Sequence, residues 1–321
     1  MAYRSLFRRG FDRLSRRVKP ALGQPVSLVD ADAFRHFWQQ KHDLFEAVEI
    51  NQAKRDFIDR MAYPERRYII FFTPRSGSSR LGNLIGQTGY LHDPGEPFNP
   101  DFVPKIAKGL QAKDVPSYVE GLLRKRNLNA TFGGEITFRQ LHNVFGSMES
   151  MLDLLRPTSC FWLIREDLVA QAVSLSRRQQ TQISHSPQAD ADAQLRGETL
   201  FTYDAKTIKL AVEALCWQEN RMEELFTKHG LSPLRLSYET TVQCDADDLL
   251  EAVASHIGLE RGVLRQTKPS HEKLKGTKSA QFIERFKREN AAYVDFIQNR
   301  RKARLEALQP IGKDAKCDAG L

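Results

Sequence analysis

Cysteines are few in this sequence, and long apolar runs are absent. The four cysteines among 321 residues are too far apart for the ligand spacing of a zinc site. Cys160 and Cys216 stand among apolar residues, so we expect buried free thiols, which are typical of a reducing compartment and predict a cytoplasmic protein. No stretch approaches the roughly 18 apolar residues that span a membrane. We expect no cleavable signal peptide, because the N-terminal residues lack its apolar segment.

Acidic residues are outnumbered by basic ones. The chain has 48 Lys and Arg against 40 Asp and Glu, a net charge of +8. Such an excess suits an anionic nucleotide, an anionic membrane surface or nucleic acid. We expect no nucleic-acid partner, because the sequence contains no motif of a DNA- or RNA-binding module.

Residues 1–20 carry seven Lys or Arg and one acidic residue, Asp12. Their apolar residues recur near helical spacing, so a basic amphipathic helix could rest on the inner face of a membrane as a peripheral contact. A disordered tail, a helix packed on its own domain and a transit peptide fit the same composition. All four alternatives stay open from the sequence.

The stretch YIIFFTPRSGSSRLGN, residues 68–83, combines a strand, a turn and a helix. Five apolar residues predict a parallel strand buried on both faces, and helical spacing begins at Leu81. Between them, Thr73–Ser79 form a turn of small residues. Loop N–H groups and the helix dipole would face a bound phosphate. Gly77 allows close approach of the backbone, and Arg75 adds a permanent cation.

Ser76, Ser78 and Ser79 add hydroxyl donors to this candidate phosphate loop. It is not a Walker A loop, which ends in Gly-Lys-Ser/Thr with the lysine on the outer phosphates. A P-loop-like nucleotide kinase or other phosphotransferase would need that lysine, so we keep this class only as an alternative. A non-catalytic nucleotide-binding protein is another alternative, and an ordinary Ser/Gly turn is the simplest one.

A second motif, SCFWLIREDLVAQAVSLSRRQQT, covers residues 159–181. Its apolar first part predicts another buried strand, and Arg165 stands at the end of that strand. Asp167 can cap the helix that we expect to begin at Leu168, and Ser174 lies on this helix. A planar guanidinium together with a hydroxyl suits a doubly charged phosphate. An isolated Arg165 would more often form a surface ion pair, which is the alternative.

The segment GYLHDPGEPFNPDF, residues 89–102, is rich in glycine and proline and cannot form a long element. We expect it at the carboxyl end of the sheet, where ligands bind in α/β folds. Glu96, Asp93 and His92 are the residues of this segment that could act as a general base, and an ordinary turn carboxylate is the alternative for Glu96. An ordinary glutamate has a pKa of about 4.3, the value found in peptides, so it is ionised at neutral pH and can accept a proton.

These motifs resemble the bacterial trehalose 2-sulfotransferase family, whose members use 3′-phosphoadenosine-5′-phosphosulfate (PAPS) as donor. PRSGSS is similar to the family's loop for the 5′-phosphosulfate, QRSGST, with Arg75 where cytosolic sulfotransferases carry lysine. The resemblance extends over Tyr68–Glu289. It implies that Arg165 and Ser174 grip the 3′-phosphate, that Glu96 is the base, and that no metal takes part. Homodimers occur in this family.

The segment KPSHEKLKGTKSAQFIERFKRE, residues 268–289, resembles the basic loop that sulfotransferases close over the 3′-phosphate and the adenine. Its expected donor contacts are Lys275, Gly276 and Lys278, and a solvated charge run is the alternative. The chain departs from the family at Glu135, because relatives often carry Gly-Gly-Lys there. This departure could reflect a different acceptor.

We expect five strands separated by helical segments. They lie near residues 68–73, 90, 131–136, 160–165 and 233–238. This order predicts an α/β fold, with a P-loop-like central parallel sheet flanked by helices, as in sulfotransferases. We expect a basic tail and helical extension at 1–62, a PAPS-dependent sulfotransferase domain at 63–310 and a polar C-terminal tail at 311–321.

The predicted function is transfer of a sulfuryl group from PAPS to a hydroxyl of a carbohydrate or glycolipid. Glu96 would take the proton of the acceptor hydroxyl. Arg75, with Ser78 or Ser79, would neutralise charge on the bridging oxygen and the sulfonate.

Overall fold

The computed structural model describes residues 44–45, 48–181, 197–265 and 277–312 of the chain. The chain divides into two compact units, Met1–Asp43 and Leu44–Leu321, and every described residue belongs to the second. The basic segment at residues 1–20 lies outside the described residues, as do Lys275 and Gly276.

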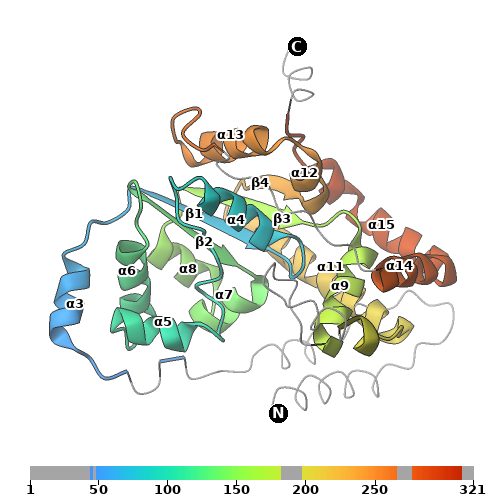
Figure 1. The fold of residues 1–321 in the computed structure, drawn as a ribbon, viewed down its shortest axis with the longest axis horizontal. Coiled ribbons are helices and arrows are strands. Elements are labelled where there is room, and N and C mark those ends of the chain that lie inside the picture. The colour runs from blue at the N-terminus through green and yellow to red at the C-terminus, as the bar shows by residue number, and fades with distance from the viewer. Residues whose placement is uncertain (1–43, 46–47, 182–196, 266–276, 313–321) are drawn as a thin grey trace. The chain divides into compact units, whose positions relative to one another are not determined.

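Four parallel strands form one sheet in the order β2-β1-β3-β4 (Figure 1). The strands are β1 (Arg66–Phe72), β2 (Thr131–Ile136), β3 (Ser159–Ile164) and β4 (Leu234–Ser237). The register pairs Ile69 of β1 with Gly134 on one side and with Cys160 on the other. This sheet confirms the predicted α/β fold with a central parallel sheet.

The predicted strand near residue 90 is wrong. Residues 88–96 form turns and loop, because Gly89 and Gly95 both have a positive φ, of 70° and 50°, that extended backbone does not adopt. Tyr90 and Leu91 have the apolar character of a strand, yet they pack against the core from this loop, and Leu91 is buried.

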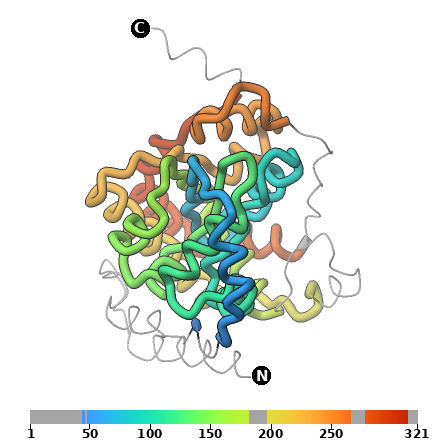
Figure 2. The backbone as a smooth tube through the Cα atoms, turned by 90° about the vertical axis from the view of Figure 1, so that its left-hand side faces the viewer, coloured from blue at the N-terminus to red at the C-terminus, as the bar shows by residue number. Residues whose placement is uncertain are grey.

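The side chains of β1 alternate between two cores, as the two faces of a strand require. Tyr68, Ile70 and Phe72 pack into the core beneath α4 (Ser78–Gln87) and α13 (Ala246–Ile257). Ile69 and Phe71 enter the core on the opposite face. In Figure 2, α4 and the green segments of α7 and α8 lie on opposite sides of the blue β1.

Several helices cover that opposite face. They are α5 (Val103–Leu110), α6 (Val115–Lys125), α7 (Phe138–Phe145), α8 (Met148–Leu155) and the second half of α11 (Ala205–Lys228). A short helix, α3 (Gln52–Asp59), contributes Ile58 to the same core.

A third core joins helices beyond the sheet. It is formed by α9 (Leu168–Thr181), the first half of α11, α14 (Thr277–Glu289) and α15 (Ala291–Glu306). These helices lie together at one end of the sheet in Figure 1. The remaining helix, α12 (Tyr238–Gln243), begins directly after β4.

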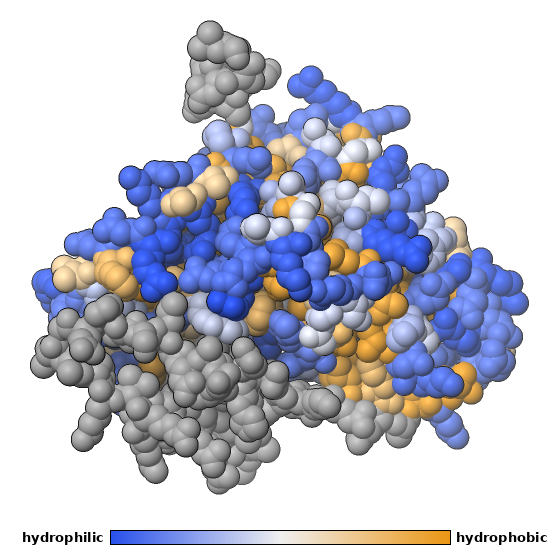
Figure 3. Space-filling model, turned by 180° about the vertical axis from the view of Figure 1, so that it is seen from behind, coloured by the Kyte–Doolittle hydropathy of each residue, from blue (hydrophilic) through white to orange (hydrophobic). Residues whose placement is uncertain are grey.

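The described surface is mainly hydrophilic, and hydrophobic residues gather toward one side of the face in Figure 3. The large hydrophobic side chains with the greatest exposure are Ile50, Phe57, Tyr63, Phe102, Leu200, Val242 and Phe296. Among the described residues, no helix has both the length and the apolar character to cross a membrane.

Candidate active site

The sheet topology has a switch point between β1 and β3, and we call the region outside the carboxyl ends of these two strands the crevice. The chain leaves β1 toward β2 on one side and leaves β3 toward β4 on the other, so the loops after these adjacent strands diverge. Ligands of open parallel sheets bind at such a point, outside the carboxyl ends of the strands. The loop at residues 73–77 and the turn at residues 165–167 flank this crevice.

The loop after β1 has the geometry of an anion cradle. Arg75 and Gly77 both lie in the left-handed region, with φ of 70° and 90°, and α4 begins at Ser78 without a side-chain cap on its N-terminus. The N–H groups of a first helical turn have no intrahelical partner and favour an anion. Ser76 is fully buried, and its Oγ has no hydrogen-bond partner among the described residues.

Gly77 is required where it stands. A Cβ at this position would lie 2.5 Å from Cδ2 of Tyr238, closer than any real side chain packs. A non-glycine residue in the left-handed region is strained by about 1–2 kcal/mol. Arg75 carries that strain in the same loop, and strained residues of this kind gather at functional sites.

Arg75 and Ser174 meet across the crevice. Nε of Arg75 donates to Oγ of Ser174 at 3.1 Å, although the two residues are 99 positions apart. Burial lowers the pKa of the Arg75 guanidinium, and the nearby guanidinium groups of Arg178, Arg165 and Arg177 lower this pKa further. Arg165 and Arg177 are paired with Glu239 and Glu198, and the cluster of guanidinium groups would still attract a polyanion.

Arg165 contacts two residues that directly follow β4. Its guanidinium carbon is 4.7 Å from the ring centre of Tyr238, a cation–π distance. Nε of Arg165 is 3.5 Å from Oε1 of Glu239. Tyr238 is therefore close to both the loop at Gly77 and the guanidinium of Arg165, and Glu239 restrains that guanidinium.

Tyr238 and Glu239 are site residues that the sequence reasoning missed. Both follow β4 directly. The signal was present, because the carboxyl ends of parallel strands meet at one edge of the sheet and a strand was predicted at residues 233–238.

Asp167 caps α9 as predicted, since its Oδ1 accepts from the N–H of Ala170 at 2.9 Å. Lys287 of α14 also reaches Asp167, with Nζ 2.8 Å from Oδ2. Lys278 points elsewhere, because its Nζ donates to the backbone carbonyls of Glu198 and Phe201. Thus α14 contacts the turn after β3 through Lys287, and the predicted contact of Lys278 with the donor stays a prediction.

Glu96 is held by two side-chain amides. Its Oε2 accepts from Nε2 of Gln140 at 2.6 Å and from Nδ2 of Asn99 at 3.0 Å. Both hydrogen bonds from the described residues go to Oε2, so Oε1 is available to accept a proton. The negative charge of Glu96 raises the pKa of Arg75, so the two side chains lie within electrostatic range of each other.

Gln140 reaches Glu96 because of how α7 begins. Thr137 follows β2 and caps α7, with its hydroxyl accepting from the N–H of Gln140 and its own N–H donating to the Gln140 amide. This Thr-x-x-Gln capping box is visible in the sequence, but its second contact, to Glu96, depends on the fold. The loop of Glu96 is fixed as well, since the N–H of Glu135 donates to O of Gly95 at 2.8 Å.

A second carboxyl group, Glu135, lies beside this site and is almost fully buried. Burial and, to a lesser extent, the negative charge of Glu96 raise its pKa to about 8, against the lowering effect of a hydrogen bond from Ser78. Glu135 is therefore mainly protonated at neutral pH. It links the phosphate loop, through Ser78, to the loop that carries Glu96.

The alternative bases occupy less suitable positions. Oδ1 of Asp93 accepts from the N–H of Gly95 at 2.9 Å and lies beneath α4, 2.7 Å from where a Cβ at Gly82 would be. His92 is exposed.

Of the predicted loop hydroxyls, Ser79 is exposed, whereas Ser76 and Ser78 are buried. Within the described ranges, no cluster of His, Cys, Asp and Glu could hold a metal ion.

The chain was compared with known proteins. A family described as Stf0 sulphotransferase matches residues 140–289, and no curated protein matches the chain. The matched segment contains Arg165, Ser174 and Lys278, whereas Arg75 and Glu96 precede it. The Stf0 family comprises the trehalose 2-sulfotransferases, so residues 140–289 of this chain carry the pattern of the sulfotransferase family that its motifs resemble.

Proposed function

We propose that this protein transfers a sulfuryl group from PAPS to a hydroxyl of a carbohydrate or glycolipid. The family match supports a sulfotransferase. The observation that carries the proposal further is the contact of Arg75 with Ser174. It joins the loop that would hold the 5′-phosphosulfate to the helix that would hold the 3′-phosphate, as a donor with two separate anionic groups requires.

The residues of the crevice fit such a donor. The hydroxyl of Ser76 and the N-terminus of α4, which have no side-chain partner or cap within the described part of the chain, suit the 5′-phosphosulfate. Arg165, with the hydroxyl of Ser174, suits the doubly charged 3′-phosphate, because a planar guanidinium forms paired hydrogen bonds with phosphate oxygens. On the family resemblance alone, we propose that Lys275 and Gly276 lie over the 3′-phosphate, and that Lys278 joins them by leaving the carbonyls that its Nζ contacts here.

PAPS supplies an activated sulfuryl group whose bond to phosphate breaks as the acceptor oxygen bonds to sulfur. In our proposal, Oε1 of Glu96 accepts the proton that the acceptor hydroxyl loses. Gln140 and Asn99 hold the other carboxylate oxygen and so orient the base. Arg75 stabilises the negative charge that develops on the leaving phosphate oxygen, and most of the rate enhancement comes from such positioning and charge stabilisation.

The acceptor class rests on the family. A sulfotransferase of this kind implies a small-molecule acceptor, and we propose a sugar hydroxyl. Glu135 stands where relatives often carry lysine. Its carboxyl is mainly protonated at neutral pH and supplies no positive charge in place of that lysine, which favours an uncharged hydroxyl acceptor over an anionic one.

We further propose a cytoplasmic location. Cys160, Cys216 and Cys244 are free, and burial raises the pKa of the Cys160 thiol to about 12, which keeps it unreactive. Peripheral membrane contact through residues 1–20 and formation of a homodimer remain predictions from the sequence and the family.

A turnover assay tests the proposal. Purified protein is given PAPS and a panel of sugars and glycolipids, and release of 3′-phosphoadenosine-5′-phosphate (PAP) is measured. We expect acceptor-dependent release that Glu96→Gln lowers by at least about 100-fold, the size of a general-base contribution, while PAP affinity is retained.

The matched control is Glu65→Gln. Glu65 is exposed and directly precedes β1, at the opposite edge of the sheet, so this variant should keep normal turnover. Near-normal turnover of Glu96→Gln would exclude Glu96 as the base. Absence of PAP release with every acceptor, together with hydrolysis of ATP, would point to the phosphotransferase alternative.

A further inference from the structure

A charged side chain is fully buried on α15, outside the segment that matches the family. Arg301 is 0% exposed, and α15 begins at Ala291, whereas the family match ends at residue 289. Neither the motifs nor the family match assigns a role to this helix.

Arg301 forms a two-pronged ion pair with Glu219 of α11. Its Nε lies 2.8 Å from Oε2 of Glu219 and its Nη2 lies 2.9 Å from Oε1. Glu219 is also fully buried, and Nη1 of Arg304 donates to its Oε2 at 2.6 Å. The carboxylate therefore accepts hydrogen bonds from two arginines of α15.

The remaining donors of Arg301 go to the backbone after β3. Nη2 donates to the carbonyl oxygen of Arg165 at 2.6 Å, and Nη1 donates to that of Glu166 at 2.8 Å. These two carbonyls belong to the turn that presents the guanidinium of Arg165 to the crevice. Arg301 thus contacts the backbone of the residue that we place on the 3′-phosphate.

The same turn is held from its other side by Glu239. The carboxylate of Glu239 accepts from the N–H of Glu166 at 2.9 Å and from that of Asp167 at 3.4 Å. Cationic donors therefore hold the carbonyls of the turn, and an anionic acceptor holds its N–H groups. A turn fixed on both sides leaves Arg165 little freedom in the direction of its Cα–Cβ bond.

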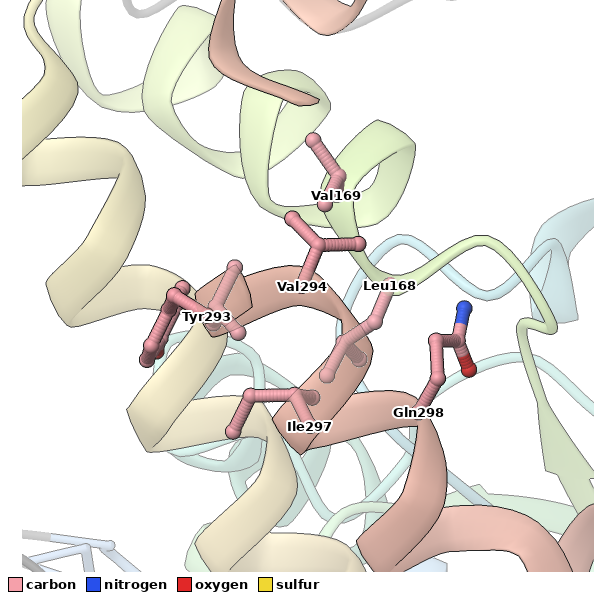
Figure 4. Close-up of a pocket in the computed structure, with 7 residues that line it drawn as sticks. Leu168, Val169, Tyr293, Val294, Ile297 and Gln298 are labelled. Atoms are coloured by element: carbon pink, nitrogen blue, oxygen red, sulfur yellow. The ribbon is translucent and has the colours of Figure 1, made fainter. Parts of the chain in front are cut away.

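Apolar contacts bring α15 to this position. Ile297 lies one helical turn before Arg301, and these two are the buried residues of α15. Figure 4 shows Val294 and Ile297 of α15 beside Leu168 and Val169 of α9, around a small apolar gap. Because α9 begins immediately after the turn, α15 packs against both the turn and the helix that follows it.

Stability alone does not explain a buried ion pair here. Removing two charges from water is costly, and apolar residues of similar volume often replace such a pair without loss of stability. A guanidinium, unlike an apolar side chain, can bind one carboxylate and two carbonyls in one plane. The distinctive effect of Arg301 is therefore the placement of two carbonyl groups.

We propose that Arg301 is a positioning residue for donor binding. By holding the carbonyls of Arg165 and Glu166, it aims the guanidinium of Arg165 at the 3′-phosphate of the donor. This inference rests on the proposed function, because it takes Arg165 as the 3′-phosphate ligand. It makes the C-terminal helix a required part of the donor site.

The test compares the affinity of the full chain for PAP with that for AMP, which lacks the 3′-phosphate. Arg301→Lys keeps a cation opposite Glu219 but cannot reach the carboxylate and both carbonyls together. We expect this variant to reduce the preference for PAP over AMP by about tenfold or more, as for loss of a hydrogen bond to a charged group. The dissociation constant for AMP should stay within about twofold.

Arg304→Lys is the matched control. Arg304 pairs with the same carboxylate of Glu219 and with Asn220, yet no contact joins it to the carbonyls of Arg165 and Glu166 among the described residues. The Arg304→Lys variant should prefer PAP over AMP as strongly as the unmodified protein does. In an Arg165→Ala background, Arg301→Lys should cause no further loss of preference, because its effect passes through Arg165.

Three results would overturn the inference. An Arg301→Lys protein with unchanged preference for PAP would show that Arg301 does not aim Arg165. A parallel loss of PAP and AMP affinity would assign Arg301 a general structural role. An unmodified protein without preference for PAP would instead refute the proposed donor, and this inference with it. If Arg301→Lys does not fold, the neutral pair Arg301→Gln/Glu219→Gln takes its place in the same comparison.

Discussion

Nε of Arg75 donates a hydrogen bond to Oγ of Ser174 at 3.1 Å. Arg75 lies on the loop after β1 and Ser174 lies on the helix after β3, so this contact joins the two sides of the crevice. Neither motif by itself could place the guanidinium of Arg75 beside the hydroxyl of Ser174. The parallel pairing of β1 with β3 brings the two motifs to one place.

Ser174→Ala should weaken the binding of PAP. The change removes a hydroxyl that is positioned to bond a charged phosphate, and such a bond contributes about 1.5–3 kcal/mol. We expect PAP affinity to fall by about tenfold or more, measured by calorimetry, with AMP affinity less affected. Ser255→Ala, an exposed position on α13, is the control and should bind PAP normally.

Gly77→Ala should damage the phosphate loop. The new Cβ would lie 2.5 Å from the ring of Tyr238, and the backbone has φ of 90°. We expect the free energy of unfolding to fall by about 2 kcal/mol or more, from left-handed strain and overpacking together, and PAP binding to be lost as Tyr238 moves. Urea unfolding and calorimetry measure the two effects.

Gly230→Ala separates strain from crowding. Gly230 has φ of 63°, and a Cβ added there would meet no atom within 4 Å, so only the left-handed strain of about 1 kcal/mol applies. PAP affinity should stay normal in this variant. Equal effects of both substitutions on PAP binding would contradict the role that we assign to the contact with Tyr238.

The buried carboxyl of Glu135 should make stability depend on pH. Its pKa is about 8 in the folded protein against 4.5 ordinarily. Between these values the folded protein holds a proton that the unfolded chain releases. Stability therefore decreases as pH rises through this window, by up to about 1.4 kcal/mol per pH unit. Below pH 4.5 the carboxyl is protonated in both states and contributes no slope.

Glu135→Gln tests this dependence, because the amide keeps the shape of the protonated acid but cannot ionise. The variant should gain stability relative to the unmodified protein as pH rises from 5 to 8, values that lie within the window set by the two pKa values. Urea unfolding at several pH values measures the difference. A stability difference that stays constant across this range would show that Glu135 does not titrate as we describe.

Gln140→Glu should separate the cap of α7 from the support of the base. Glutamate is also favoured at this third helical position, so the cap persists. However, a carboxylate would replace the amide that donates to Oε2 of Glu96 at 2.6 Å. We expect turnover to fall by about tenfold or more, because a charge-assisted hydrogen bond is lost and two carboxylates then repel each other, and we expect thermal stability to fall as well, because Gln140 is buried. A variant with full turnover would show that this contact does not orient the base.

The local patterns of the sequence predicted much of the candidate site. Arg75 and Arg165 each follow an apolar segment that forms a strand, and parallel strands carry such ends to one edge, whereas Glu96 follows a loop segment that forms no strand. The predicted cap at Asp167 is confirmed by its bond to Ala170. The roles of these residues in binding and catalysis stay predictions.

Other features depended on contacts between distant segments. Tyr238 meets Gly77, and Arg301 meets the turn at Arg165, and no local pattern encodes either pairing. The strand predicted near residue 90 is wrong for a different reason. Leu91 is apolar because it is buried from a loop, and it does not pair in the sheet. Hydrophobic character alone cannot distinguish these two environments.

The most direct test of the account is calorimetric titration with PAP, AMP and ATP, each with and without magnesium. We predict that PAP binds without magnesium and about 100-fold more tightly than AMP. Arg165→Ala should remove most of this preference, whereas Arg261→Ala, a highly exposed position beyond α13, should retain it. Preference for ATP with magnesium, or absence of nucleotide binding, would contradict a PAPS-dependent sulfotransferase.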